Sequence, residues 1–155
     1  MATKGKKATA HDAQTLIQLY DLRREPTMRK ARDFVIGQFW PSTYEDFQAV
    51  MNGFGSEQNA YARQALTYWD MAAAMVLEGA LHEGLFFKCN GELHFLFAKF
   101  GHYLPQLRKE SANPEFLINF EKLATKSPEA KARVKRIQEM LKARFSAGAR
   151  AKTAG

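Results

Sequence analysis

The stretch Leu19-Tyr-Asp-Leu-Arg-Arg-Glu-Pro-Thr-Met-Arg-Lys-Ala-Arg32 places five cations within ten residues around a proline. Apolar side chains recur at helical spacing both before and after it. Because proline starts helices far more readily than it continues them, the stretch predicts two helices that meet at a corner near Pro26. At about 100° per residue, Arg23 continues the first apolar stripe and Arg32 falls beside the second. These two guanidinium groups are therefore expected to point at or near the core.

A buried guanidinium group is costly unless a carboxylate pairs with it. We therefore expect Arg23 and Arg32 to form structural ion pairs that hold the helical corner together. The candidate acids are Asp70 and Glu78 on the central helix, or Glu121 further along the chain. Two alternatives remain open at this point: an anion or phosphate site at the corner, and arginines that are plain surface charges.

Helix signals recur along the rest of the chain. Ser127-Pro128-Glu129 and Asn113-Pro114-Glu115 each combine an N-cap residue, a proline at the first helical position and an acid. Ser42–Glu45 has the pattern of a capping box. The apolar segment from Ser56 to about Phe87 predicts a long central helix. The sequence therefore predicts an all-α fold, a single-domain bundle of about six helices over residues 11–145.

The segment 85–95 allows two interpretations. Asn90-Gly91 lies between apolar arms, which is a strong signal for a β-hairpin. The arms do not alternate cleanly, however, and a long helical stripe begins at Leu93. This pattern favours a helix–turn–helix and leaves the hairpin as the alternative.

The net charge of +7 is unevenly distributed along the 155 residues. Residues 1–10 carry +3 and residues 126–155 carry +7, whereas the segment between them carries −3. We expect residues 1–10 and 146–155 to be disordered basic tails. No apolar run follows the N-terminal lysines, and ionisable groups interrupt the longest apolar region. The sequence thus predicts a cytoplasmic protein and makes membrane insertion unfavourable.

No catalytic or metal-binding motif is evident in the sequence. Glu78-x-x-x-His82 occurs once, whereas di-iron bundles repeat Glu-x-x-His on two helices. Cys89, the single cysteine, has only Lys88 beside it to favour a thiolate, so we interpret it as a small buried hydrophobe. The sequence therefore designates no catalytic residue, no metal ligand and no cofactor, and it gives no support for enzymatic activity.

The helix expected after Asn90-Gly91 carries large apolar groups on opposed faces. Its main stripe includes Phe97 and Phe100. The nearly opposite face carries Phe95, Ala98 and His102. A helix of this kind is either enclosed in the middle of the domain or covers a partner. The second face is therefore a candidate interface for a protein partner or for a second copy of the chain.

The last predicted helix has one narrow apolar seam, and most of its remaining surface is basic. The cations of this face are Lys131, Arg133, Lys135, Arg136, Lys142 and Arg144. They are either the solvated side of an outer helix or a face for an anionic partner. Such a partner is an acidic protein, an anionic membrane surface or a nucleic acid. The aromatic residues lie elsewhere, so no base-stacking platform is apparent.

Four short motifs occur in a recognisable order from Tyr61 onward. They are Glu78-Gly-Ala-Leu-His-Glu-Gly-Leu85, Phe97-Ala-Lys-Phe-Gly-His-Tyr-Leu104, Asn113-Pro-Glu115 and Phe120-Glu-Lys-Leu123. In these motifs the chain resembles a family of small bacterial helical proteins classed as a domain of unknown function, over roughly residues 12–125. The resemblance implies an all-α fold and supplies no catalytic residues.

The sequence as a whole favours a non-enzymatic interaction or regulatory module, with self-association through the aromatic-rich helix as one form of it. This expectation depends on the second apolar face, the basic last helix and the lack of a catalytic motif. The alternative is sequence-independent nucleic-acid binding through the basic C-terminal helix and the tails.

Overall fold

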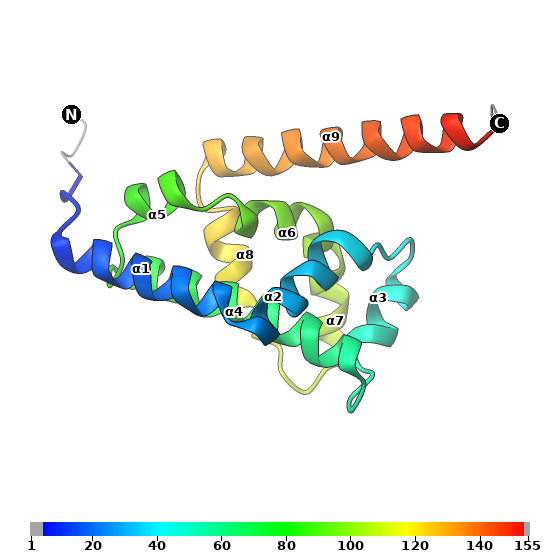
Figure 1. Ribbon diagram of the computed structural model, residues 1–155, viewed down its shortest axis with the longest axis horizontal. Helices are drawn as coiled ribbons and strands as arrows, with labels where there is room; N and C mark the ends of the chain where they lie inside the picture. Colours follow the sequence, from blue (N-terminus) through cyan, green and yellow to red (C-terminus); the bar gives the residue numbers. More distant parts are fainter. Residues whose placement is uncertain (1–4, 154–155) are drawn as a thin grey trace.

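The computed structural model describes residues 5–153, and over that range the chain is helical without any strand (Figure 1). The α-helices are α1 (Ala10–Arg24), α2 (Pro26–Asp33), α3 (Tyr44–Met51), α4 (Glu57–Leu77), α5 (Glu83–Cys89), α6 (Glu92–Phe100), α7 (Leu104–Glu110), α8 (Ile118–Ala124) and α9 (Pro128–Thr153). A π-helix, η1 (Phe34–Gln38), follows α2, and a 3-10 helix, η2 (Gly101–Tyr103), follows α6. The predicted all-α fold is confirmed, with shorter and more numerous helices than the expected six.

The corner between α1 and α2 lies where the sequence predicts it. Pro26 is the first residue of α2, and the carboxylate of Glu25 caps that helix by accepting the Met28 N–H at 2.8 Å. An acid at this position also compensates the positive end of the helix dipole. The two helices thus meet at a corner that the side chain before the proline stabilises.

The predicted single helix from Ser56 to Phe87 is wrong, because α4 ends at Leu77. Gly79 has a φ of 74°, which places it in the left-handed region that ends many helices. The Ala80 N–H donates to the carbonyl of Met75 at 2.9 Å, as expected for this type of helix end. The chain then reverses into α5, so the apolar run is divided between two helices.

Residues 85–95 form the helix–turn–helix rather than the β-hairpin. α5 ends at Cys89 and α6 begins at Glu92, so Asn90 and Gly91 connect two helices. The amide of Asn90 donates back to the carbonyl of Phe86 at 3.1 Å and stabilises the end of α5. This short connection determines where the first residue of α6 lies.

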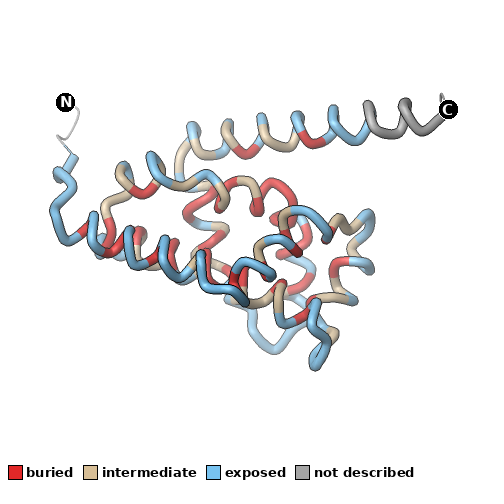
Figure 2. The backbone as a smooth tube through the Cα atoms, in the orientation of Figure 1, coloured by how far each residue is buried: buried red, intermediate tan, exposed pale blue. Residues whose placement is uncertain are grey.

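α4 forms the centre of the molecule, packed against α2 on one side and α8 on another. Figure 2 shows the buried positions concentrated where these helices meet α6. The largest buried side chains there include Trp69, Phe47, Phe86, Phe100 and Phe120. Aromatic rings from η1 and the residue after it, from α3 and from α6 pack against one another at the end of this core, with Phe39 and Phe100 centroids 5.3 Å apart.

The π-helix η1 interrupts the regular hydrogen bonding that α2 would otherwise continue. The Phe39 N–H donates to the carbonyl of Phe34, five residues earlier, at 2.8 Å. Single π-turns of this type are frequent at functional sites. Here the widened turn leaves the carbonyl groups of Val35 and Ile36 available to a side chain from α6.

α9 lies as a separate layer across α6 and extends past the body of the molecule (Figure 1). It continues to Thr153, beyond the predicted end of the domain at residue 145. Of the predicted N-terminal tail, residues 5–9 have no regular structure and Ala10 already belongs to α1. Residues 1–4 and 154–155 lie outside the described residues.

Candidate functional site

The arginines of the α1–α2 corner contact one carboxylate, that of Glu92. Arg32 binds it through Nε at 3.0 Å and Nη2 at 2.5 Å, and Arg23 Nη2 binds it at 3.2 Å. The indole N–H of Trp69 donates to the same carboxylate at 3.1 Å. The amide oxygen of Asn90 accepts a further hydrogen bond from Arg23 at 3.1 Å. We call this group of residues the Glu92 cluster.

The Glu92 cluster is a structural element because its two arginines share one largely buried carboxylate. Among its buried side-chain nitrogen and oxygen atoms, only the Nε of Arg23 lacks a hydrogen-bond partner within the described residues. The side chain of Glu92 is 9 % exposed, and those of Arg23 and Arg32 are 15 % and 24 % exposed. Hydrogen bonding to Glu92 raises the pKa of Arg32 above its ordinary value, against the effect of burial. The cluster joins α1, α2, α4 and α6 at the point where the Asn90-Gly91 turn delivers Glu92.

The acids expected to pair with these arginines lie elsewhere in the structure and do not contact them. Asp70 caps α8, accepting the Phe120 N–H at 2.8 Å, because its position on α4 faces that helix. Glu78 is exposed at the end of α4, since the helix stops there. Glu121 pairs with Arg108 instead. The predicted pairing with Asp70 and Glu78 is therefore wrong.

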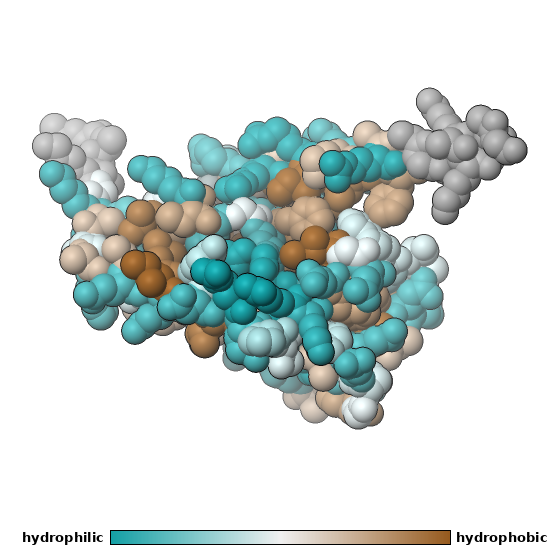
Figure 3. Space-filling model, in the orientation of Figure 1, coloured by the Kyte–Doolittle hydropathy of each residue, from teal (hydrophilic) through white to brown (hydrophobic). Residues whose placement is uncertain are grey.

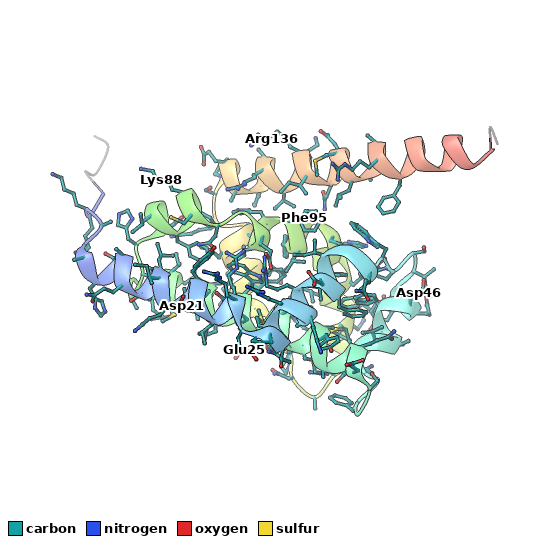
Figure 4. The ribbon with its side chains drawn as sticks, viewed as in Figure 1. Asp21, Glu25, Asp46, Lys88, Phe95 and Arg136 are labelled. Carbon is teal, nitrogen blue, oxygen red and sulfur yellow. The ribbon has the colours of Figure 1, made fainter. Side chains whose placement is uncertain are left out.

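The second face of α6 lies under α9. Ala98 is buried, and its carbonyl accepts a hydrogen bond from Gln138 of α9 at 3.4 Å. Figure 4 shows Phe95 on the side of α6 that faces α9. Phe95 packs edge-on against Trp40 at 6.4 Å, and His102 is exposed. The three residues of the predicted interface thus face a helix of the same chain.

A groove of about 740 Å³ remains between these helices, and we call it the α6–α9 groove. Trp40–Ser42 form one end, α6 and η2 form the floor, and α9 forms the roof from Gln138 to Ser146. Figure 3 shows hydrophobic surface in this region between α9 and the body. Trp40 packs against Phe145 across the groove at 5.0 Å. The charged residues that line the α6–α9 groove are Lys99 and Lys142, and no acid is among its lining residues.

Lys99 is the most unusual side chain of the groove. It is 7 % exposed, and its Nζ donates to the carbonyl of Val35 at 2.5 Å. The same Nζ lies 3.5 Å from the centre of the Trp40 ring, a cation–π distance. Among the described residues no carboxylate forms an ion pair with it. Burial lowers the pKa of Lys99 to about 7, so both its charged and its neutral forms are accessible near neutral pH.

The basic face of α9 divides into two flanks. At about 100° per residue, the lysines lie on one flank of the helix and the arginines on the other. The lysines are 131, 135 and 142, and the arginines are 133, 136 and 144. None of these six cations forms an ion pair within the part of the chain whose side chains the structure describes. Both flanks are therefore available to anions.

Sequence reasoning missed Glu92, Lys99 and Trp40. Lys99 lies four residues after Phe95 and three before His102, so it belongs to the same helical face. A lysine within an apolar face was the available signal for its burial. No comparable signal marked Glu92, because its position depends on the turn before it. Trp40 lies outside any α-helix, and the π-helix that places it has no recognised sequence signature.

Cys89 is exposed, contrary to its interpretation as a buried hydrophobe, because it is the last residue of the short helix α5. Within the described residues, no group of three or more His, Cys, Asp or Glu side chains is arranged to hold a metal ion. No helix in the described range is long and apolar enough to span a membrane.

These features define a single-domain, all-helical protein with a structural ionic cluster and a groove between α6 and α9. The chain belongs to the family described as a domain of unknown function (DUF4760), whose model matches residues 8–127. This confirms the family resemblance seen in the sequence, and the matched region ends immediately before α9. Neither the curated proteins nor the solved structures that were compared include a match.

Proposed function

We propose that the protein is a non-enzymatic interaction module that binds an acidic, apolar-anchored segment of a partner protein in the α6–α9 groove. The observation that supports this most is the lining of the groove. Apolar and aromatic side chains line it together with polar ones, and Lys99 and Lys142 are its charged residues. A segment with an apolar side chain and neighbouring carboxylates complements that lining.

The dimensions of the groove also favour a peptide segment. It follows α9 from Gln138 to Ser146, which corresponds to roughly 12 Å at 1.5 Å per residue. The rings of Trp40 and Phe145 lie at one position along it and provide an aromatic anchor of the kind that dominates binding energy at interfaces. The family region supplies the floor and α9 supplies the roof.

Self-association through the second face of α6 would require α9 to leave that face first. A second copy of the chain is therefore a less favoured occupant than a separate acidic partner. We also propose a cytoplasmic location, which agrees with an exposed free cysteine that has no disulfide partner in its own chain.

Selection from a random peptide library tests this function. We expect the selected peptides to combine Asp or Glu with Leu, Phe or Trp, and to change the fluorescence of Trp40 on binding. Phe145→Ala should weaken binding at least about tenfold, or 1.4 kcal/mol. Met140→Ala is the matched control, because Met140 is an exposed residue of the same helix that does not line the groove. Selected peptides without acids, or equal binding by the two variants, would refute the proposal.

A second candidate function is sequence-independent binding of nucleic acid along α9. The specific observation in its favour is that the six cations of the basic face make no ion pair with any described side chain. Phosphate backbones bind to such a surface by releasing counterions.

A salt titration tests this second candidate with duplex DNA and RNA. The logarithm of the affinity should fall linearly with the logarithm of the salt concentration, by about 0.9 for each neutralised phosphate of B-DNA. Replacing Lys131, Lys135 and Lys142 together by Gln should reduce that slope. A slope that these changes leave unaltered would exclude the lysine flank of α9.

A further inference from the structure

A second cavity, of about 260 Å³, lies at the start of α9, away from the α6–α9 groove. Its lining comes from three helices, α5, α6 and α9, and includes Phe87, His94, Ser127, Arg133 and Arg136. The first turn of a long helix is the positive end of its dipole and attracts anions. The other lining residues determine whether this helix end forms a specific anion-binding site.

His94 gives independent evidence that the cavity binds a polar ligand. The residue is 2 % exposed, and its ring packs against Phe87 with centroids 4.8 Å apart. Neither ring nitrogen has a hydrogen-bond partner among the described residues, although both are buried. A buried polar group left without a hydrogen bond is costly and rare in native proteins. A ligand that accepts a hydrogen bond from the imidazole removes that cost.

Two arginines of α9 extend along the same cavity. Arg133 and Arg136 are one turn apart on the arginine flank, and within the described residues neither has a carboxylate at ion-pair distance. Gly91 leaves room for the first of them, since a Cβ at Gly91 would lie 3.2 Å from Arg133 Nη2. Guanidinium groups match the geometry of phosphate oxygens better than ammonium groups do.

Two acids, Glu83 and Glu129, line the cavity together with the two arginines. Glu83 is neutralised by its ion pair with Lys126, which is not a lining residue. Glu129 is exposed on the first turn of α9 and offsets one of the two arginine charges, so one positive charge remains in excess. Ser127 accepts the Ala130 N–H at 3.1 Å and so forms the start of the helix.

We propose that this cavity is a binding site for a phosphate monoester, held by Arg133, Arg136 and the ring N–H of His94 at the positive end of α9. The site is separate from the α6–α9 groove and does not depend on the function proposed for it. Free phosphorylated metabolites and phosphorylated side chains of a partner protein share this chemistry.

Titration of the full chain with inorganic phosphate tests the site, with the histidine ring resonances followed by NMR. Burial and the nearby Arg133 lower the pKa of His94 to about 4. Phosphate binding should move the His94 resonances and raise that pKa, because an anion beside the ring favours the imidazolium. The other charged groups near the ring, Arg136, Glu83, Glu129 and Lys126, are present in both titrations, with and without phosphate. Unchanged His94 resonances at saturating phosphate would overturn the proposal.

Matched variants of α9 distinguish a specific phosphate site from general electrostatic attraction of phosphate to the basic helix. Arg133→Gln and Arg136→Gln should each weaken phosphate binding at least about tenfold, or 1.4 kcal/mol. Lys135→Gln removes the same charge from the opposite flank and should change the affinity less than about twofold. Glu129→Gln should strengthen binding by a few fold, because it removes a competing anion. Equal losses in the Arg133 and Lys135 variants would show attraction to the helix as a whole and overturn the site.

His94→Leu distinguishes a ligand-binding histidine from a structural one. Replacement of an unpartnered buried imidazole by an apolar group of similar size should leave the melting temperature unchanged or raise it. The same variant should lose phosphate binding. Retained binding would overturn the role of His94.

A comparison of ligands then identifies the source of the phosphate. A phosphoserine peptide that binds more tightly than inorganic phosphate indicates a phosphorylated partner. A small sugar phosphate that binds more tightly than the peptide indicates a metabolite.

Discussion

The two arginines of the Glu92 cluster and the buried lysine, Lys99, differ in what they contact. In the Glu92 cluster, one carboxylate accepts hydrogen bonds from Arg23, Arg32 and Trp69. Lys99 instead contacts the carbonyls of a π-helix and the ring of Trp40, all of them neutral. A cation with a carboxylate keeps its charge and holds helices together, whereas a cation among neutral groups remains titratable. The first arrangement is structural, and the second lies in the groove that we propose for binding.

The largest effect is expected when the carboxylate is removed from the Glu92 cluster. Glu92→Gln leaves two guanidinium groups without a counter-charge, so it should lower the free energy of unfolding by about 3–5 kcal/mol. Urea denaturation measures this loss. Glu78→Gln, at an exposed position, is the control and should change stability by less than about 0.5 kcal/mol. A loss of similar size in both variants would contradict the structural role of the cluster.

An intermediate effect on the free energy of unfolding is expected from the titration of Lys99. The pKa of Lys99 is about 7 in the folded state and close to 10.5 when the chain unfolds. Between these values the unfolded chain binds more protons, so this group makes the protein more stable as pH rises from 7 toward 10. The slope is at most about 1.4 kcal/mol per pH unit.

Comparison with Lys99→Met isolates that effect from other titrating groups. Urea midpoints of the two proteins at several pH values from 7 to 9.5 give the difference in slope. The wild-type protein should gain stability relative to the variant across this range. Parallel pH profiles would show that Lys99 keeps its charge in the folded state.

A smaller effect should rank the two arginines of the Glu92 cluster. Arg32 uses both Nε and Nη2 on Glu92, whereas Arg23 uses only Nη2. Arg32→Lys loses the two-point contact and should lower stability by about 1–2 kcal/mol, and Arg23→Lys by less. Thermal unfolding at pH 7 gives the order. The reverse order would show that the contact of Arg23 with Trp69, at 5.3 Å from the ring, matters more than the ion pair.

Most of the fold could be predicted from the sequence, because helix periodicity and helix ends are local signals. The corner at Pro26 and the inward direction of Arg23 and Arg32 follow from spacing alone. The pairing of these arginines with Glu92 does not follow from spacing, because Glu92 lies 60 residues or more away in the sequence. The turn at Asn90 and Gly91 places it beside them. Long-range pairing of this kind depends on how the helices pack.

Signals near helix ends were less reliable when two candidates lay close together. The capping box of α3 uses Thr43 and Asp46, one residue later than the Ser42–Glu45 pattern predicts. Asn113-Pro114 begins only a turn, and α8 starts at Ile118 after Leu117 adopts a φ of 56°. At Ser127-Pro128 the prediction is confirmed, because α9 begins at Pro128.

The candidate sites could be predicted only in part. The second face of α6 was visible in Phe95, Ala98 and His102, and its enclosure within the domain was one of the two alternatives left open; that α9 provides the cover was not predicted. The environment of Lys99 could not be predicted, because it depends on a π-helix and the local spacing of residues does not indicate one. The unpartnered ring of His94 likewise appears only when α5, α6 and α9 are brought together.

The π-helix makes the groove sensitive to chain length as well as to residue type. A π-turn holds one more residue than the α-turn it replaces, so η1 behaves as a one-residue insertion in α2. Deletion of a single residue within 34–38 would let an ordinary α-turn form in place of the widened one. The carbonyl groups that accept from Lys99 would then be drawn into regular helical hydrogen bonding, although the lysine itself had not been altered. Relatives that lack this one residue should therefore lack the lysine–carbonyl contact, even where the lysine is retained.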